Sequence, residues 1–310
     1  MSTIANSANS TGGNQHTPFA TGSVISADGT TIGYHQMGQG PALIMLHGAN
    51  TSGLDFTQLA EGLADLFTVY LPDRRGRGLS GPFSKNYSIQ EEVEDLAALV
   101  NKTGARLLYG VSGGGLICLQ ASLSLPSIQK MALYEPALLL DGATHTAWLP
   151  RFDQEMAEGK VAAALVTSMK GLELGGPVMN AMPGFLLELL TNAAMKGEDK
   201  KAGPDDITMR KLAPTLHYDG LLLAEGSGQL ERYRAVSAEV LLLGGSKGLP
   251  FLKPSLDALE KTLPHVVKRV EFPGLEHGGS NNPSQTNRGS KPELVVQELR
   301  PFLAGHSMCC

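Results

Sequence analysis

A serine lies between glycines at the point where an apolar run gives way to a helical pattern. The run Leu107–Val111 has the composition of a buried strand, and Ser112 follows it in the pattern Gly-x-Ser-x-Gly. A segment with helical character, residues 116–125, comes directly afterwards. Glycines let a strand and a helix approach closely at such a turn, and the free N–H groups that open the helix lie beside the serine oxygen. We therefore predict that Ser112 is a nucleophile.

A serine hydroxyl is a poor nucleophile at neutral pH, so it needs a base beside it to take its proton. Histidine is the side chain whose unperturbed pKa suits that task. Of the eight histidines in the chain, His277 alone follows a late predicted strand on a loop that carries glycine, at Gly274. His277 is therefore the predicted base.

Apolar strands and helices alternate along the chain and would bring these two residues together. An Asp-Gly turn at Asp28 predicts a hairpin between residues 23–26 and 30–36. The segments predicted to be further strands are 41–46, 67–71, 107–111, 128–134, 239–245 and 266–272. The segments predicted to be helices between and after them are 54–66, 88–102, 116–125, 252–262 and a last helix that opens near residue 290. Such alternation indicates an α/β protein with a parallel sheet covered on both faces.

Two helix starts carry specific signals. Ser88 with Glu91 has the spacing of a capping box, and Ser290 with Pro292 and Glu293 places a serine at the cap and a proline in the first turn. These patterns predict that both serines cap the helices that follow.

The strand pattern is interrupted once, and the chain divides accordingly. Residues 23–136 and 238–304 are predicted to form the α/β core, and residues 137–237 an inserted helical lid. The polar residues 1–22 are predicted to be a disordered arm and residues 305–310 a flexible tail.

Composition excludes several classes of function. The chain has 310 residues, 42% of them hydrophobic and 18% charged, and its net charge of −5 gives no reason to expect a nucleic-acid or membrane partner. The three cysteines, Cys118, Cys309 and Cys310, form neither a disulfide framework nor a zinc motif, so we expect no metal. Without a secretory signal or a long apolar run, a soluble cytoplasmic protein is expected. The composition is also compatible with a homodimer.

The chain resembles the α/β-hydrolase superfamily from Ser23 to Ala304. Four motifs carry the resemblance in the family's order: 47–50 (His-Gly-Ala-Asn), 73–78 (Asp-Arg-Arg-Gly-Arg-Gly), the Ser112 turn and the loop that ends in His277. The resemblance implies an eight-stranded, mostly parallel sheet with a helical lid after the sixth strand. It also implies a catalytic triad in the chain order serine, acid, histidine.

The acid departs from the common family pattern. Most relatives carry an aspartate after the seventh strand, but residues 244–248 hold no carboxylate, and Asp257 lies well inside the next helix. Glu135, at the end of the sixth strand, matches a second placement, which is similar to that of haloalkane dehalogenases and zearalenone-type lactonases. Because dehalogenases have an aspartate nucleophile, Ser112 favours the lactonase type. The resemblance thus assigns Glu135 to orient His277, with Asp141 as the alternative acid.

The remaining site residues follow from the same resemblance. It implies an oxyanion hole built from the backbone N–H groups of Gly113 and Ala49. Asn50 either adds a side-chain donor to the substrate or caps the next helix. His47 is interpreted as a structural hydrogen-bonding residue, and the Asp73-Arg74-Arg75 cluster as a brace of internal ion pairs.

Substrate contacts are harder to predict from the lid. Trp148, where the lid begins, is the residue we expect to contact the substrate. A further set of apolar residues either lines a cavity or forms the lid core: Met156, Met169, Met179, Met182, Met195, Phe185 and Leu186.

These features predict a serine hydrolase that needs no cofactor and cleaves an ester or lactone of a small apolar molecule. Two alternatives remain open. The same residues serve C–C bond hydrolases, lyases and cyclases on this scaffold, and a receptor of the same fold would bind a ligand without turnover.

Overall fold

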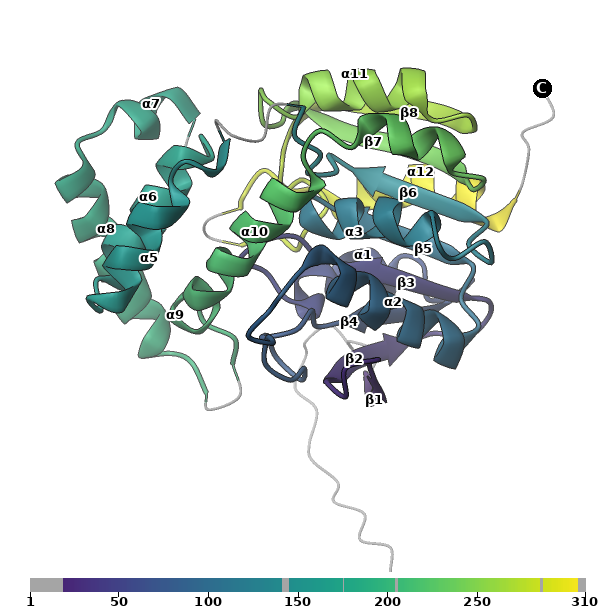
Figure 1. Cartoon of the computed structure of the whole chain (residues 1–310), viewed down its shortest axis with the longest axis horizontal. Helices are drawn as coiled ribbons and strands as arrows, with labels where there is room; N and C mark the ends of the chain where they lie inside the picture. Colours follow the sequence, from purple (N-terminus) through teal and green to yellow (C-terminus); the bar gives the residue numbers. More distant parts are fainter. Residues whose placement is uncertain (1–18, 141–144, 175, 204–205, 285–286, 306–310) are drawn as a thin grey trace, which may run out of the picture.

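The computed structural model describes residues 19–140, 145–174, 176–203, 206–284 and 287–305 (Figure 1). Its centre is a single sheet of eight strands in the order β1-β2-β4-β3-β5-β6-β7-β8. The strands are β1 (Ala20–Ile25), β2 (Thr31–Met37), β3 (Ala42–Leu46), β4 (Thr68–Pro72), β5 (Leu107–Val111), β6 (Lys130–Tyr134), β7 (Glu239–Lys247) and β8 (Val266–Glu276). β2 pairs antiparallel with β1 and β4, and every other neighbouring pair is parallel. The predicted α/β fold with a mostly parallel eight-stranded sheet is confirmed.

Helices cover both faces of the sheet because successive side chains of a strand point to opposite sides. The core on one face combines Ile44 and Leu242 with the helices α2 (Ile89–Thr103), α3 (Gly113–Ser122) and α11 (Lys253–Thr262). The core on the other face combines the neighbouring Leu43 and Leu243 with α1 (Thr57–Glu61), which follows the 3-10 turn η1 (Gly53–Phe56), and α12 (Pro292–Ala304).

Between β6 and β7 the described residues form helices and no strand. These helices are α5 (Leu149–Ala157), α6 (Val161–Gly171), α7 (Gly176–Ala181), α8 (Gly184–Asp199), α9 (Met209–Leu212) and α10 (Leu216–Gly226), with 3-10 turns η2 (Ala213–Thr215) and η3 (Leu230–Ala235). In Figure 1, α5 to α9 stand away from the sheet and α10 lies between them and the core. A separate apolar cluster, which includes Trp148, Phe152 and Leu216, holds them together.

Several details differ from the sequence prediction. The predicted arm extends to residue 22, but β1 begins at Ala20, because residues 20–25 pair with residues 31–36 of β2. Residues 1–18 of that arm and the terminal cysteines lie outside the described residues. α2 begins at Ile89 as predicted, yet the capping box does not form: the Glu91 carboxylate accepts hydrogen bonds from Arg75 and from Ser84 instead.

The predicted cap of the last helix also differs. The residue before α12 is Lys291, whose side chain makes no capping hydrogen bond, and the Ser290 hydroxyl donates to the carbonyl of Asn281. Pro292 opens the helix as expected. None of the helices in the described part of the chain combines the length and the apolar character that a bilayer-spanning segment requires.

Candidate active site

Ser112 is held in a strained turn between β5 and α3. Its φ of 53° and ψ of −122° lie outside the common regions for residues other than glycine, and such a conformation costs about 1–3 kcal/mol. Hydrogen bonds to the end of β6 hold the turn: the Ser112 N–H donates to Tyr134 O (3.0 Å), and the Ala137 N–H donates to Ser112 O (2.9 Å). A Cβ atom on Gly110 or Gly114 would lie 2.7 Å or 2.4 Å from backbone carbonyl oxygens, so both motif positions require glycine.

Glu135 and His277 are hydrogen-bonded. Glu135 directly follows β6, and its Oε2 lies 2.6 Å from His277 Nδ1, while its Oε1 accepts from the Gly245 N–H at 2.8 Å. The Glu135 side chain is buried and that of His277 is 22% exposed. Because an ionised carboxylate only accepts hydrogen bonds, this contact places the imidazole proton on Nδ1 and leaves Nε2 free to accept one.

The end of β7 and the residue that follows it leave room for this carboxylate. A Cβ atom on Gly248 would lie 1.8 Å from Glu135 Oε1, and one on Gly244 would lie 3.3 Å from its Cγ. The two glycines therefore make space for the carboxylate that arrives from the end of β6. Of the other two carboxylates considered as the acid, Asp257 of α11 pairs with Arg269 of β8 at 2.5 Å. Asp141 lies outside the described residues.

The backbone N–H groups of Ala49 and Gly113 belong to residues that line the same cavity as Ser112. Among the described residues, neither N–H group donates to a backbone carbonyl in the turns, loops and helix caps. The Ala49 N–H shares its peptide bond with the Gly48 carbonyl, which three donors contact: His47 Nδ1 (2.9 Å), Thr51 Oγ1 (3.1 Å) and Arg74 Nη1 (3.4 Å). These contacts hold the peptide plane in place and polarise it.

His47 is buried and neutral. Burial lowers the pKa of its imidazole well below 6.5, and the charges of Arg77 and Arg74 lower the pKa further. Its Nε2 accepts from the Arg74 N–H at 3.0 Å, so its proton lies on Nδ1 and is donated to Gly48 O. His47 therefore has the structural hydrogen-bonding role expected from the sequence.

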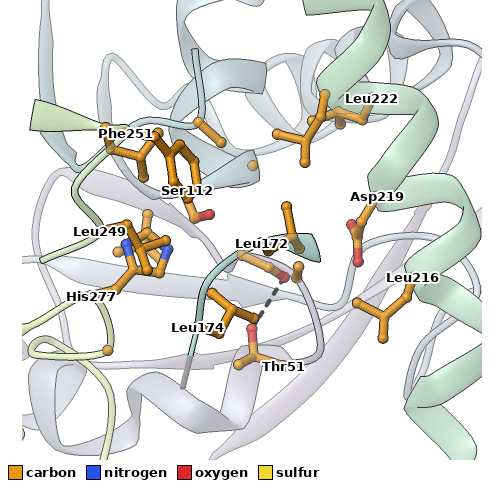
Figure 2. Close-up of a pocket in the computed structure, with 18 of the residues that line it drawn as sticks. Thr51, Ser112, Leu172, Leu174, Leu216, Asp219, Leu222, Leu249, Phe251 and His277 are labelled. Atoms are coloured by element: carbon orange, nitrogen blue, oxygen red, sulfur yellow. Dashed lines mark hydrogen bonds between the residues drawn. The ribbon is translucent and has the colours of Figure 1, made fainter. Parts of the chain in front are cut away.

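Ser112 and His277 line one cavity, whose wall also includes residues of α10 (Figure 2). The space between its protein atoms is about 790 Å³, which includes open solvent at the mouth. Most of the wall is apolar: Leu172, Leu174, Leu216, Leu222, Leu223, Leu249, Phe251 and Leu252. Within the described residues the Ser112 hydroxyl makes no hydrogen bond to His277, and such bonds often tighten only when substrate binds.

The two predicted substrate contacts are placed differently. Trp148 lines the cavity and also belongs to the lid core, and its indole N–H donates to His145 O at 2.8 Å. Asn50 does not line the cavity, because the chain turns there with a φ of 53° and its Oδ1 is buried. Nor does it cap the next helix, where Ser52 is the cap.

The methionines, Phe185 and Leu186, which were expected either to line a cavity or to form the lid core, are not among the described residues of the cavity wall. Met195 is buried in the lid core and Met156 packs against it, whereas Phe185 is 74% exposed. The wall residues come instead from loops and from α10, which sequence periodicity does not distinguish from other leucine-bearing segments. Asp219 on α10, also in the wall, was not predicted from the sequence.

The arginines after β4 pair with other elements, so the predicted brace of internal ion pairs is wrong. Arg74 binds Glu92 of α2 (2.7 Å) and Asp219 of α10 (3.0 Å), and Arg77 binds the same Asp219 (2.7 Å). Asp73 accepts from backbone N–H groups, including that of Gly53 at 2.9 Å. The cluster thus joins the core to the lid, because its long side chains reach helices on both sides of the loop.

Comparison with known proteins places this geometry in a family. Residues 43–298 match the model of the alpha/beta hydrolase family, and the chain belongs to that family. It is similar to a pimeloyl-[acyl-carrier protein] methyl ester esterase of Xanthomonas axonopodis pv. citri (strain 306), with 26% identity over 74% of this chain and 85% of that protein.

Solved structures show the same fold. An alpha/beta hydrolase from Sphaerobacter thermophilus DSM 20745 has 27% identity and a TM-score of 0.70, over 91% of this chain and all of that one. A thermophilic esterase from Thermogutta terrifontis has 18% identity and a TM-score of 0.69, over 92% of this chain and 98% of that one. The family and its esterase relatives support a hydrolase.

Proposed function

We propose that this chain is a serine hydrolase that cleaves a carboxylic ester or lactone of a small apolar molecule through an acyl-enzyme on Ser112. The observation that carries the proposal is the Glu135–His277 hydrogen bond of 2.6 Å at the edge of an apolar cavity that Ser112 also lines. The position of Glu135 after β6 favours the resemblance to zearalenone-type lactonases, and the methyl ester esterase relative supports ester chemistry.

The reaction follows from these side chains. His277 Nε2 takes the proton of Ser112 as Oγ attacks the carbonyl carbon, and Glu135 stabilises the imidazolium that forms. The N–H groups of Ala49 and Gly113 receive the oxyanion. The intermediate collapses, the alcohol oxygen takes the proton from His277, and the acyl group stays on Ser112; the alcohol of an ester departs, and that of a lactone remains attached to the acyl chain. Water then attacks the acyl carbon while His277 takes its proton, and the acid leaves as His277 returns that proton to Ser112 Oγ.

A panel of aryl esters and macrocyclic lactones tests this proposal. We expect wild-type hydrolysis, loss of at least about a thousandfold in kcat for Ser112→Ala, and an acyl adduct on Ser112 detected by mass spectrometry after rapid acid quench. Hydrolysis that persists in Ser112→Ala would refute the nucleophile. Tight ligand binding without turnover by the wild type would favour a receptor, and turnover of C–C substrates without an acyl adduct would favour a lyase.

A further inference from the structure

Asp219 lines the cavity and has no role in the reaction proposed above. Figure 2 shows its carboxylate on the side of the cavity away from His277, with Ser112 between them. Apart from His277, Asp219 carries the only ionisable side chain among the described residues of the wall. A carboxylate in an apolar wall costs free energy unless it is paired, so its partners decide what it does there.

Two buried arginines hold the carboxylate in position. Arg74 Nη1 donates to Oδ1 at 3.0 Å and Arg77 Nη2 donates to Oδ2 at 2.7 Å. Both arginine side chains are at most 1% exposed, and that of Asp219 is 6% exposed. Each carboxylate oxygen has room for about two hydrogen bonds and receives one from the described residues, so each can accept another from a ligand.

The charges around Asp219 favour a neutral donor. Arg74 also binds Glu92 at 2.7 Å, so two guanidinium groups face two carboxylates in this cluster. An anionic ligand group would meet the Asp219 carboxylate, and a cationic group would meet two guanidinium groups close behind it. A hydroxyl group brings a hydrogen-bond donor without adding charge.

We propose that Asp219 is a specificity-determining residue, which accepts a hydrogen bond from a hydroxyl group of the substrate on the side of the cavity away from His277. The inference rests on the proposed function, which places the reacting carbonyl at Ser112. The substrate class becomes an apolar ester or lactone that carries a free phenol or alcohol. A competing substrate without that hydroxyl covers the carboxylate with apolar atoms and leaves its remaining acceptor positions unfilled, so that substrate is disfavoured.

A substrate series tests the inference on the wild-type protein. The 4-nitrophenyl esters of phenylacetic, 3-phenylpropanoic and 4-phenylbutanoic acid vary the reach, and each is prepared with a para hydroxyl, a para methoxy or no substituent. We expect kcat/KM for the hydroxyl ester to exceed that of its methoxy and unsubstituted partners by about tenfold or more for at least one chain length. Equal values at every length would overturn the proposal without any variant.

Variants separate substrate contact from a purely structural role. In Asp219→Asn and Asp219→Ala the preference for the hydroxyl ester should fall by about threefold or more. Asp153→Asn is the matched control, because Asp153 pairs with His217 of α10 but does not line the cavity, and it should keep the preference. If Asp219 only anchors the lid, its variants will slow all esters by one factor and leave the ratio unchanged, which contradicts the inference.

Binding measurements distinguish this inference from the proposed function. The N-methyl amides of the same acids are titrated into Ser112→Ala by calorimetry, where no turnover is needed. Tighter binding of the hydroxyl amide than of the methoxy amide, by about tenfold, supports the subsite even if no ester is hydrolysed and the proposed function fails. Equal binding of the two amides at all three lengths, alongside ester hydrolysis that depends on Ser112, overturns the subsite alone.

Discussion

Glu135 reaches His277 across 142 residues of sequence, and the contact depends on the conformation of a single residue. Glu135 has a φ of 42°, a strained value for a residue other than glycine, directly after β6. Its N–H donates to Leu243 O at 2.9 Å, which ties the turn to β7. The chain therefore maintains strain at both Ser112 and Glu135, and strain of this kind clusters where side chains do chemistry.

Glu135→Gln tests the acid. The amide is nearly the same size, but its N–H₂ group can face Nδ1 and favour the wrong tautomer of His277. We expect kcat to fall by about 10²–10⁴-fold with little change in KM. Asp257→Asn, which alters a carboxylate on α11, is the control and should keep full activity. Near-normal turnover by Glu135→Gln would show that another group orients His277.

Thr51→Val tests the support of the oxyanion peptide. The substitution keeps the shape of the side chain but removes one of the three donors to Gly48 O, so the Ala49 N–H becomes less polarised and less firmly held. Steady-state kinetics should show kcat about three- to tenfold lower at unchanged KM. The comparison is Thr57→Val, whose lost hydroxyl donates to Leu54 O outside the cavity. Equal kcat values for the two variants would contradict the role of Thr51.

The end of β7 shows how one element makes room for a residue from another. Gly248 follows β7, and its Cα lies so near the Glu135 carboxylate that no side chain fits between them. Tyr134 at the end of β6 donates through its hydroxyl to Glu276 O at 2.9 Å, which fixes the loop that carries His277. Three strand ends, those of β6, β7 and β8, thus bring Glu135 and His277, the proposed acid and base, together.

Gly248→Ala tests this arrangement. The new methyl group must displace Glu135 or the loop, so we expect a loss of about 1–3 kcal/mol in the free energy of unfolding together with reduced kcat. Gly197→Ala is the matched control, because a Cβ on Gly197 of α8 meets no atom within 4 Å, and alanine there should stabilise the helix by up to about 1 kcal/mol. Urea denaturation and ester turnover measure both effects. A Gly248→Ala variant as stable and active as wild type would exclude a spacing role for this glycine.

At the scale of the whole molecule, buried polar groups link the sheet to the lid. His47 at the end of β3 binds the backbone of Arg74, whose side chain reaches both α2 and Asp219 of α10. Removing one partner of such a network leaves an unpaired buried charge, which usually costs more than the pair itself contributes. The network also makes folding sensitive to the protonation of His47.

The stability of the protein should therefore fall as the pH drops below about 6.5. Burial, then Arg77 and Arg74, lower the pKa of His47 in the folded protein, while the unfolded chain keeps the ordinary value of 6.5. Below that value the unfolded chain binds a proton that the folded one excludes, so the contribution of neutral His47 is complete above it and is lost as the pH falls. The loss is up to about 1.4 kcal/mol per pH unit.

Urea denaturation at about pH 7.5, 6.5 and 5.5 measures this slope. His47→Gln removes the titrating group, so it should be less stable than wild type at about pH 7.5 yet lose less of its stability on acidification. Identical slopes for the two proteins would show that His47 does not govern this pH range.

The sequence alone determined the order of the elements and the positions of the candidate nucleophile and base. Alternating strands and helices, the turn at Ser112 and the late glycine loop before His277 are local patterns, because backbone conformation depends largely on neighbouring residues. The sequence also shows that residues 244–248 contain no carboxylate, which favours Glu135 as the acid.

Only the tertiary structure decided what surrounds those residues. The partners of Arg74, the leucines of the cavity wall and the place of Asp219 within it come from segments far apart in the chain. Helix periodicity shows that α10 has an apolar face but not which element that face will meet. The predicted capping hydrogen bonds are absent for the same reason, because the Glu91 carboxylate pairs with Arg75 and the Ser290 hydroxyl donates to Asn281 O. Side-chain pairing is settled by packing between elements, which local sequence patterns do not encode.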